Sequence, residues 1–167
     1  LEKVGAKMDK DLWCGKCAID DPEKLLKVHE NYINSGVDVI TTNTYATTPI
    51  SMKEYGYENF TNEWNKKSVE IAIEAANNSN REIAVAGSVS TSGSWDRLEI
   101  DQLKLGFIEH LTILSDAGVD LIILEAMTSK NATVETIIEC STKINLPIWL
   151  SISCALNEKD KKLMHGY

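Results

Sequence analysis

The strongest constraint on the fold of this chain is the order of its sequence patterns. A helix pattern followed by a strand pattern occurs four times in succession. The helix patterns have apolar residues three or four positions apart, and the strand patterns are apolar, largely β-branched runs. Helices that alternate with buried strands are typical of a parallel sheet with covering helices. The predicted helices span 20–36, 60–78, 101–117 and 131–144, and the predicted strands span 37–40, 83–89, 119–125 and 146–154.

Two of the junctions between helix and strand are nearly identical. Gly36 is followed by Val37-Asp38, and Gly118 is followed by Val119-Asp120, so each glycine stands where a left-handed residue ends a helix. This internal repeat of the junction favours a barrel of repeated units over a sheet whose strand order reverses. A (β/α)8 barrel needs about 250 residues and eight strands, whereas this chain has 167 residues. We therefore expect one domain that is about half a barrel, with a small open α/β domain as the alternative.

The composition excludes several classes of protein. With 25 acidic and 17 basic residues the formal charge is −8, whereas a phosphate backbone needs clustered Lys and Arg, so we expect no nucleic-acid partner. No apolar run approaches the ~20 residues of a membrane span and no signal peptide opens the sequence, so we expect no membrane partner. Four cysteines do not suggest a disulfide scaffold in a chain of this size. The cysteine count therefore favours a reducing, cytoplasmic location.

Polar residues that follow the apolar strands are the first candidates for a site. Glu125 ends the run Leu121–Leu124, so it should lie at the C-terminal mouth of a strand, where barrel active sites are found. The alternative interpretation of Glu125 is a solvated acid at a strand end that binds no ligand. Asn43 and Thr44 occupy the same mouth after the first predicted strand. Their side chains could hydrogen-bond a substrate or brace the cavity, or they could cap the following loop.

The cysteines and histidines give weaker indications. The run Cys14-Gly15-Lys16-Cys17 has the spacing of a redox or zinc site, but no strand pattern precedes it and no second pair completes a structural zinc site. Cys140 is expected in the core, and Cys154 is expected as a thiol in a pocket wall at the end of the last predicted strand. Three histidines have no partner pattern for a metal or a triad and are expected to be structural or solvated: His29, His110 and His165.

Several of these segments together resemble the homocysteine S-methyltransferase family, a zinc-dependent barrel domain found also in betaine–homocysteine methyltransferase and in cobalamin-dependent methionine synthase. The most specific segment is Gly36-Val37-Asp38-Val39-Ile40-Thr41-Thr42-Asn43-Thr44-Tyr45. The other segments match in order and spacing over nearly the whole chain: Leu12-Trp13, Asp21-Pro22-Glu23, Ala86-Gly87-Ser88-Val89, Ala117–Glu125 and Pro147–Cys154.

The resemblance implies that the parent protein transfers a methyl group from a donor to the zinc-activated thiolate of homocysteine, giving methionine. It also implies a partial (β/α)8 TIM barrel, in which 1–167 is a single incomplete homocysteine-binding domain, truncated at both ends and covering roughly the second to fifth strands. The zinc cysteines of the family lie in Asn-Cys and Gly-Gly-Cys-Cys motifs that this sequence lacks. We therefore expect Zn2+ in the intact family member, no metal ligand and no catalytic residue in this chain, and no activity of the fragment alone.

The resemblance also implies substrate-binding residues. The matching glutamate of the family contacts the amino group of homocysteine, which implies that role for Glu125. Trp13-Cys14 matches a Trp followed by a small hydroxyl residue near the substrate, and the cysteine weakens the hydrogen bond that a hydroxyl would make. The expected substrate-binding residues are Glu125, Asn43, Thr44, Trp13 and Cys14, and the expected partners are homocysteine and a methyl donor. Two alternatives stay open: a barrel enzyme of other chemistry, and a non-catalytic barrel module that has lost the zinc cysteines.

Overall fold

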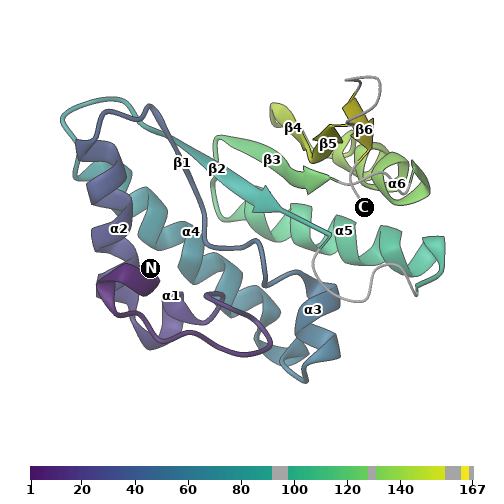
Figure 1. Ribbon diagram of the computed structural model, residues 1–167, viewed down its shortest axis with the longest axis horizontal. Helices are drawn as coiled ribbons and strands as arrows, with labels where there is room; N and C mark the ends of the chain where they lie inside the picture. Colours follow the sequence, from purple (N-terminus) through teal and green to yellow (C-terminus); the bar gives the residue numbers. More distant parts are fainter. Residues whose placement is uncertain (92–97, 128–130, 157–162, 166–167) are drawn as a thin grey trace.

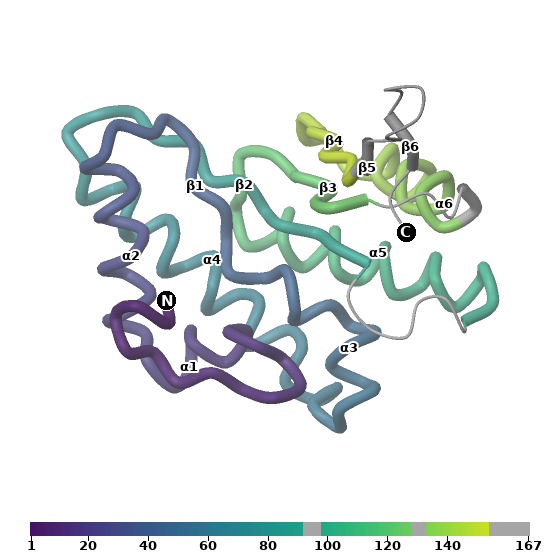
Figure 2. The backbone as a smooth tube through the Cα atoms, viewed as in Figure 1, coloured from purple at the N-terminus to yellow at the C-terminus, as the bar shows by residue number. Residues whose placement is uncertain are grey.

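Four parallel strands form the central sheet of the computed structural model, which describes residues 1–91, 98–127, 131–156 and 163–165 (Figure 1). They are β1 (Val39–Thr41), β2 (Ala84–Val89), β3 (Leu121–Met127) and β4 (Ile148–Ile152). Their order in the sheet is their order in the sequence, and every neighbouring pair is parallel. Successive strands therefore add in one direction across the sheet (Figure 2). The predicted α/β class with four helix–strand units is confirmed.

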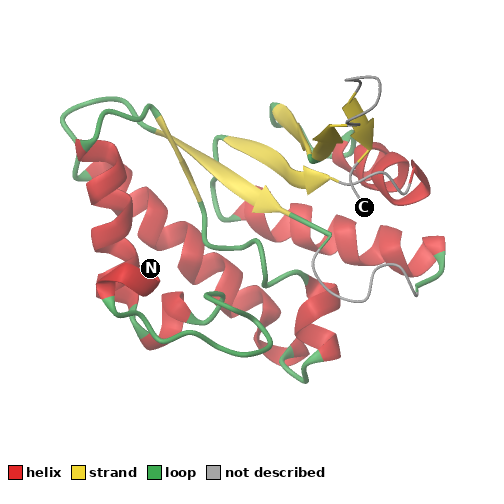
Figure 3. Cartoon of the chain, in the orientation of Figure 1, coloured by secondary structure: helices red, strands yellow, loops and turns green. Residues whose placement is uncertain are grey.

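One main helix precedes each strand. The four helices are α2 (Pro22–Asn34), α4 (Thr61–Asn77), α5 (Ile100–Asp116) and α6 (Asn131–Ser141). Helices α2, α4 and α5 run along one side of the strands (Figure 3). Apolar side chains of the helices and the sheet meet in one main core, in which Val69, Leu111 and Ile122 are completely buried. Burial of these helix faces against the sheet is the main stabilising contribution to the fold.

The two glycines of the repeated junction adopt the left-handed conformation predicted for them. Gly36 has a φ of 100° and Gly118 a φ of 94°, so the chain can turn directly from each helix into the next strand. Asp21 is the N-cap residue of α2, but its side chain bonds no helix amide. Its carboxylate instead accepts from the amide of Lys7 at 2.9 Å and pairs with Lys24 at 2.7 Å, which ties the N-terminal segment to the helix.

Short elements fill the connections. The N-terminal segment contains η1 (Glu2–Val4) and α1 (Cys17–Asp20), and the segment between β1 and α4 contains α3 (Pro49–Glu54) and η2 (Glu58–Phe60). After β4, a separate antiparallel sheet pairs β5 (Cys154–Leu156) with β6 (Leu163–His165). The prediction that the last strand continues to Cys154 is therefore wrong. The pairing of β4 with β3 ends at Ile152, opposite Met127, and Cys154 begins the second sheet.

Buried polar side chains occur on the helices as well. His29 on α2 is 6% exposed and His110 on α5 is 1% exposed, and burial lowers the pKa of these imidazoles to about 4 and about 3. Cys140 lies in the main core, as predicted. The side chains of His165 and Cys154 are not among those that the structure describes.

Candidate functional site

The carboxyl ends of β1, β2 and β3 bring polar side chains to one edge of the sheet. Parallel strands end at the same edge. The three ends are staggered along it, because β2 runs on from Ala86, the partner of Thr41, to Val89, and β3 runs on from Leu124, the partner of Val89, to Met127. We refer to the polar residues there as the strand-end cluster, which consists of Thr42, Asn43, Thr44 and Tyr45 after β1, Ser88 and Ser90 at the end of β2, and Glu125 in β3.

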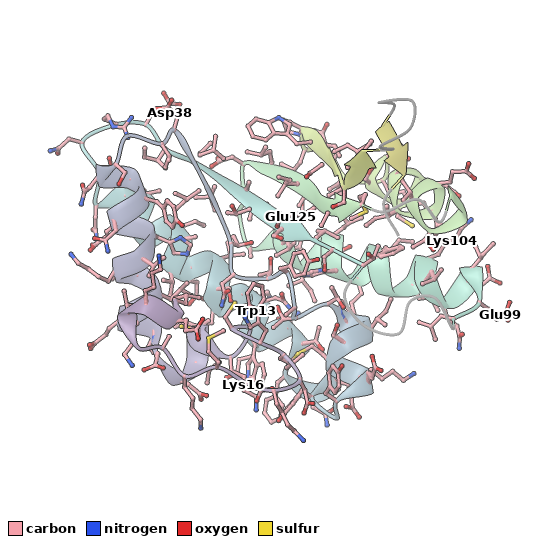
Figure 4. All side chains as sticks on the ribbon, in the orientation of Figure 1. Trp13, Lys16, Asp38, Glu99, Lys104 and Glu125 are labelled. Carbon is pink, nitrogen blue, oxygen red and sulfur yellow. The ribbon has the colours of Figure 1, made fainter. Side chains whose placement is uncertain are left out.

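Glu125 is the acid of the strand-end cluster, and Ser88 holds it. The Ser88 hydroxyl donates to Oε2 of Glu125 at 2.6 Å, from a position that is 1% exposed. Glu125 is half-buried on β3 (Figure 4), and within the described part of the chain no donor reaches its other carboxylate oxygen, Oε1. A short charge-assisted hydrogen bond of this kind fixes the direction of a carboxylate. The arrangement therefore leaves one carboxylate oxygen for a cationic partner such as an ammonium group.

A β-bulge changes the course of the chain beside Glu125. The pairing of β3 with β4 shifts register between Leu124 and Met127, and Ala126 has a φ of 54°. A residue other than glycine in this left-handed region costs about 1–2 kcal/mol. Bulges are frequent next to functional sites, where they redirect a side chain. The strained backbone of Ala126 thus directly follows the residue whose carboxylate is oriented by Ser88.

Two threonines join β1 to β2 at Ser88, the residue that holds this carboxylate. The Thr44 hydroxyl donates to the carbonyl of Ser88 at 2.7 Å, and the amide of Ser88 donates to the Thr42 hydroxyl at 3.0 Å. The two hydroxyls are 2.7 Å apart, and Thr42 is the donor because the Thr44 proton is already in use. Thr44 is completely buried. The surroundings of Thr44 therefore favour a role in bracing the strand ends over contact with a substrate.

The N-terminal loop is fastened to the end of β1 by a pair of hydrogen bonds. The Cys14 thiol donates to Oδ1 of Asn43 at 3.2 Å, and Nδ2 of Asn43 donates to the Cys14 carbonyl at 2.8 Å. Burial raises the pKa of the Cys14 thiol, which keeps the proton that this bond needs. Trp13, labelled in Figure 4, is the adjacent residue in the loop. It has a φ of 52° and is 61% exposed. Three residues predicted for the site are thus brought together: Trp13, Cys14 and Asn43.

Ser88 and Tyr45 belong to the strand-end cluster but were not predicted as site residues. Burial raises the pKa of the Tyr45 phenol, and the negative charge of Glu125 raises it further. The Ser90 hydroxyl donates to the carbonyl of Tyr45 and holds this segment against β2. The sequence gives one indication that these two residues belong to a site, which is their position. Ser88 and Tyr45 both stand where an apolar run gives way to polar residues.

The described residues do not form a metal site. Among them no three His, Cys, Asp or Glu side chains come together in a way that could hold a metal ion. Cys17 is completely buried, and burial is the main cause that raises the pKa of its thiol to about 11.

In the same described ranges, no helix has the length and apolar character needed to cross a membrane.

Known proteins share this sequence pattern. The family profile described as Homocysteine S-methyltransferase matches residues 1–167. Homocysteine S-methyltransferase 2 of Zea mays is 32% identical over 187 residues, which covers 96% of this chain and 53% of the maize protein. Selenocysteine methyltransferase of Astragalus bisulcatus is 30% identical over 162 residues, which covers 78% of this chain and 48% of that protein. The chain thus spans about half the length of the curated relatives it matches.

A solved structure shares the fold. The metallated form of the homocysteine methyltransferase MmuM from Escherichia coli superposes with a TM-score of 0.81 at 24% identity, over 93% of this chain and 60% of that chain. Structures of this kind are TIM barrels, so the prediction of a partial (β/α)8 barrel is confirmed.

Proposed function

The chain belongs to the homocysteine S-methyltransferase family, and we propose that its parent protein methylates the sulfur of homocysteine to give methionine. In this reaction the sulfur forms a bond to the methyl carbon, and the bond between that carbon and the donor breaks. This chain supplies the part of the pocket that holds the amino acid end of homocysteine. The proposal rests above all on the half-buried Glu125 carboxylate, which Ser88 holds by one oxygen at the ends of three strands.

Charge supports an ammonium group as the partner of Glu125. The strand-end cluster contains one acidic side chain, Glu125, and no Lys or Arg that could pair with it. Oε1 accepts one of the three N–H donors of the ammonium, and a hydrogen bond to a charged group contributes roughly 1.5–3 kcal/mol. Ser88 keeps Oε2 occupied, so the ammonium has one defined position.

The N-terminal loop forms a second part of the same pocket in this proposal. The Asn43–Cys14 pair holds the loop at the end of β1, and the exposed Trp13 indole offers an apolar surface to a bound molecule. Asn43 and Cys14 orient the loop, and the buried Thr44 hydroxyl supports the strand end. Homocysteine and a methyl donor are the proposed partners.

Activation of the sulfur needs groups that the described residues do not provide. A thiol is mostly protonated near neutral pH because its pKa is ~8.5. No described group fits a zinc site, and the raised pKa values of the Cys14 and Cys17 thiols disfavour thiolate ligands. We assign the zinc that the family resemblance implies to residues of the parent outside this chain. The residues of this chain bind and orient the substrate.

We further propose a reducing, cytoplasmic location. Three cysteines that the structure describes are free thiols, namely Cys14, Cys17 and Cys140, which supports this assignment.

The test is the affinity of the parent protein for homocysteine, measured by calorimetry. Glu125→Gln keeps the shape of the side chain and removes the charge, so the dissociation constant should rise about 10- to 100-fold. Glu139→Gln is the matched control, because it removes a charge that pairs with Lys104 on the surface of α6. Ser88→Ala should have a smaller effect, since it only frees the carboxylate to rotate. An unchanged affinity in Glu125→Gln would contradict the proposed role of Glu125.

A further inference from the structure

Trp13 combines a strained backbone with an exposed side chain. Its φ of 52° lies in the left-handed region that residues other than glycine seldom adopt, and the residue is 61% exposed. A conformation of this kind persists only where the surrounding structure enforces it, and such positions cluster at binding and active sites. The loop 9–16 should therefore contain groups that hold Trp13 in place.

Asp9 closes this loop around Trp13. The amide of Asp9 donates to the carbonyl of Trp13 at 2.6 Å, and its Oδ1 accepts from the amides of Asp11 and Leu12, both at 2.9 Å. The bond from the Leu12 amide is the main cause that lowers the pKa of the Asp9 carboxyl, which is therefore ionised at neutral pH. Its second oxygen, Oδ2, is left to pair with a cation.

Lys16 is that cation, and it joins Asp9 to an aromatic side chain before α4 (Figure 4). Its Nζ lies 3.1 Å from Oδ2 of Asp9 and donates to the Tyr57 hydroxyl at 2.7 Å. The same nitrogen lies 4.2 Å from the centre of the Tyr57 ring and 5.8 Å from that of the Trp64 ring, within the range of cation–π attraction. The side chains of Lys16 and Asp9 are each only 20% exposed, unlike those of an ordinary surface pair.

The aromatic residues under Lys16 belong to a packed cluster. Trp64 on α4 is 8% exposed, and its ring lies 5.2 Å from that of Tyr57 and 5.7 Å from that of Phe60. Leu12 and Met52 are completely buried in the same cluster. Lys16 is therefore anchored on a rigid support, and through Asp9 it transmits that anchoring to the backbone of Trp13.

We propose that Asp9 and Lys16 are positioning residues, which keep the Trp13 indole where it contacts bound homocysteine. Their charges pair with each other, so they act on the substrate only through Trp13. The Asn43–Cys14 pair fastens the loop on the other side of Trp13, at the Cys14 carbonyl. The inference rests on the proposed function, because it takes homocysteine as the molecule that contacts the indole.

The test uses the parent protein labelled with 5-fluorotryptophan, in which the fluorine signal of Trp13 is the one that Trp13→Phe lacks. Lys16→Met removes the ammonium and keeps an unbranched side chain. The Trp13 signal should then move toward that of the unfolded protein, and the dissociation constant of homocysteine should rise about 3- to 10-fold. Lys104→Met is the matched control, because it breaks the Lys104–Glu139 pair and should leave both readouts unchanged.

A double variant separates positioning of Trp13 from a general structural role of Lys16. Trp13→Ala removes the indole, so adding Lys16→Met to it should change the dissociation constant by less than about twofold. A Lys16 that merely stabilised the fold would weaken binding by the same factor with or without the indole.

Asp9→Asn provides a second variant, since it removes the charge that pairs with Lys16 and keeps the oxygen that accepts from Asp11 and Leu12. It should move the Trp13 signal and the affinity in the same direction, and it decides if Lys16→Met does not fold. An unmoved Trp13 signal, an unchanged affinity, or a full further loss in Trp13→Ala would each overturn the proposal. If the unaltered parent binds no homocysteine, the proposed function fails, whereas the fluorine signal still shows whether Asp9 and Lys16 hold Trp13.

Discussion

Glu125, Asn43 and Thr44 are all polar residues near strand ends, yet their surroundings give them different roles. Glu125 keeps one carboxylate oxygen available, while Asn43 uses its amide to hold the Cys14 loop. Thr44 is completely buried and bonds only within the protein in the described structure. Residue type alone does not distinguish these cases, because the difference comes from burial and from the partners that neighbouring strands supply.

The position of Glu125 was predictable from the sequence, and its partner was not. An acid directly after an apolar run predicts the end of a buried strand, which is a local pattern. The strand does not end at Glu125, however, because β3 continues to Met127. The hydrogen bond from Ser88 depends on the register between β2 and β3, and no short segment of sequence encodes that register. The bulge at Ala126 has no local signal either, since alanine is not a residue expected at positive φ.

The two buried imidazoles make stability depend on pH. Unfolded histidines have a pKa near 6.5, whereas the folded values are about 4 for His29 and about 3 for His110. The free energy of unfolding should therefore be fully developed above pH 6.5 and fall as the pH drops toward 4. Each proton taken up on unfolding contributes a slope of about 1.4 kcal/mol per pH unit. Urea unfolding between pH 7 and 4.5 measures this slope.

His29→Gln provides the control for this prediction. Glutamine does not titrate, so the variant should lose about half of the pH dependence, whatever its stability at pH 7. The carboxylates with lowered pKa values, Asp9 and Asp21, act only below about pH 4 and do not affect the result. A free energy of unfolding that stays constant from pH 6.5 to 4.5 would contradict the burial of both imidazoles.

At the scale of elements, the helices and strands with strong periodicity were predictable, and the short ones were not. β1 starts two residues later than the apolar run suggests, and just before it Arg81 binds the carbonyl of Val37 and the carboxylate of Asp38. Helix α3 has 6 residues, too few for a periodic pattern, and its signal was the Thr48-Pro49 start. The separate β5–β6 sheet depends on where pairing with β3 stops, which is a tertiary property.

Close packing of α5 on β2 gives a prediction at this scale. A Cβ at Gly87 would lie 3.0 Å from Ile122 Cδ1 and 3.2 Å from Leu114 Cδ1, and both side chains are completely buried. Gly87→Ala should therefore lower the free energy of unfolding by about 1–3 kcal/mol. Urea unfolding checks the value.

Gly106→Ala is the matched control within α5. Its Cβ would meet only the side chain of Ile50, at 3.0 and 3.3 Å, and Ile50 is partly exposed beside a groove and can move. Because alanine is favoured over glycine inside a helix by about 1 kcal/mol, stability should stay the same or rise. Equal stability of Gly87→Ala and the unaltered chain would show that α5 and β2 are not packed as described.

At the scale of the whole molecule, the sheet has two outer edges within the described residues, β1 and β4. Trp149, Leu150 and Ile152 of β4 are 51%, 44% and 56% exposed, which is unusual for apolar residues of a parallel strand. The alternating pattern made the half-barrel predictable because each unit repeats the same local arrangement. The exposure of these β4 side chains is not encoded in the repeated pattern, because it depends on what packs against the outer face of the strand.

The central claim is that the strand-end cluster holds the amino acid end of homocysteine, and a crystal structure of the parent protein with homocysteine tests it most directly. We predict the amino nitrogen at about 2.7–3.1 Å from Oε1 of Glu125, with the Ser88 hydroxyl still bonded to Oε2. A bound homocysteine whose amino group contacts other residues, while Glu125 faces only solvent, would contradict the claim.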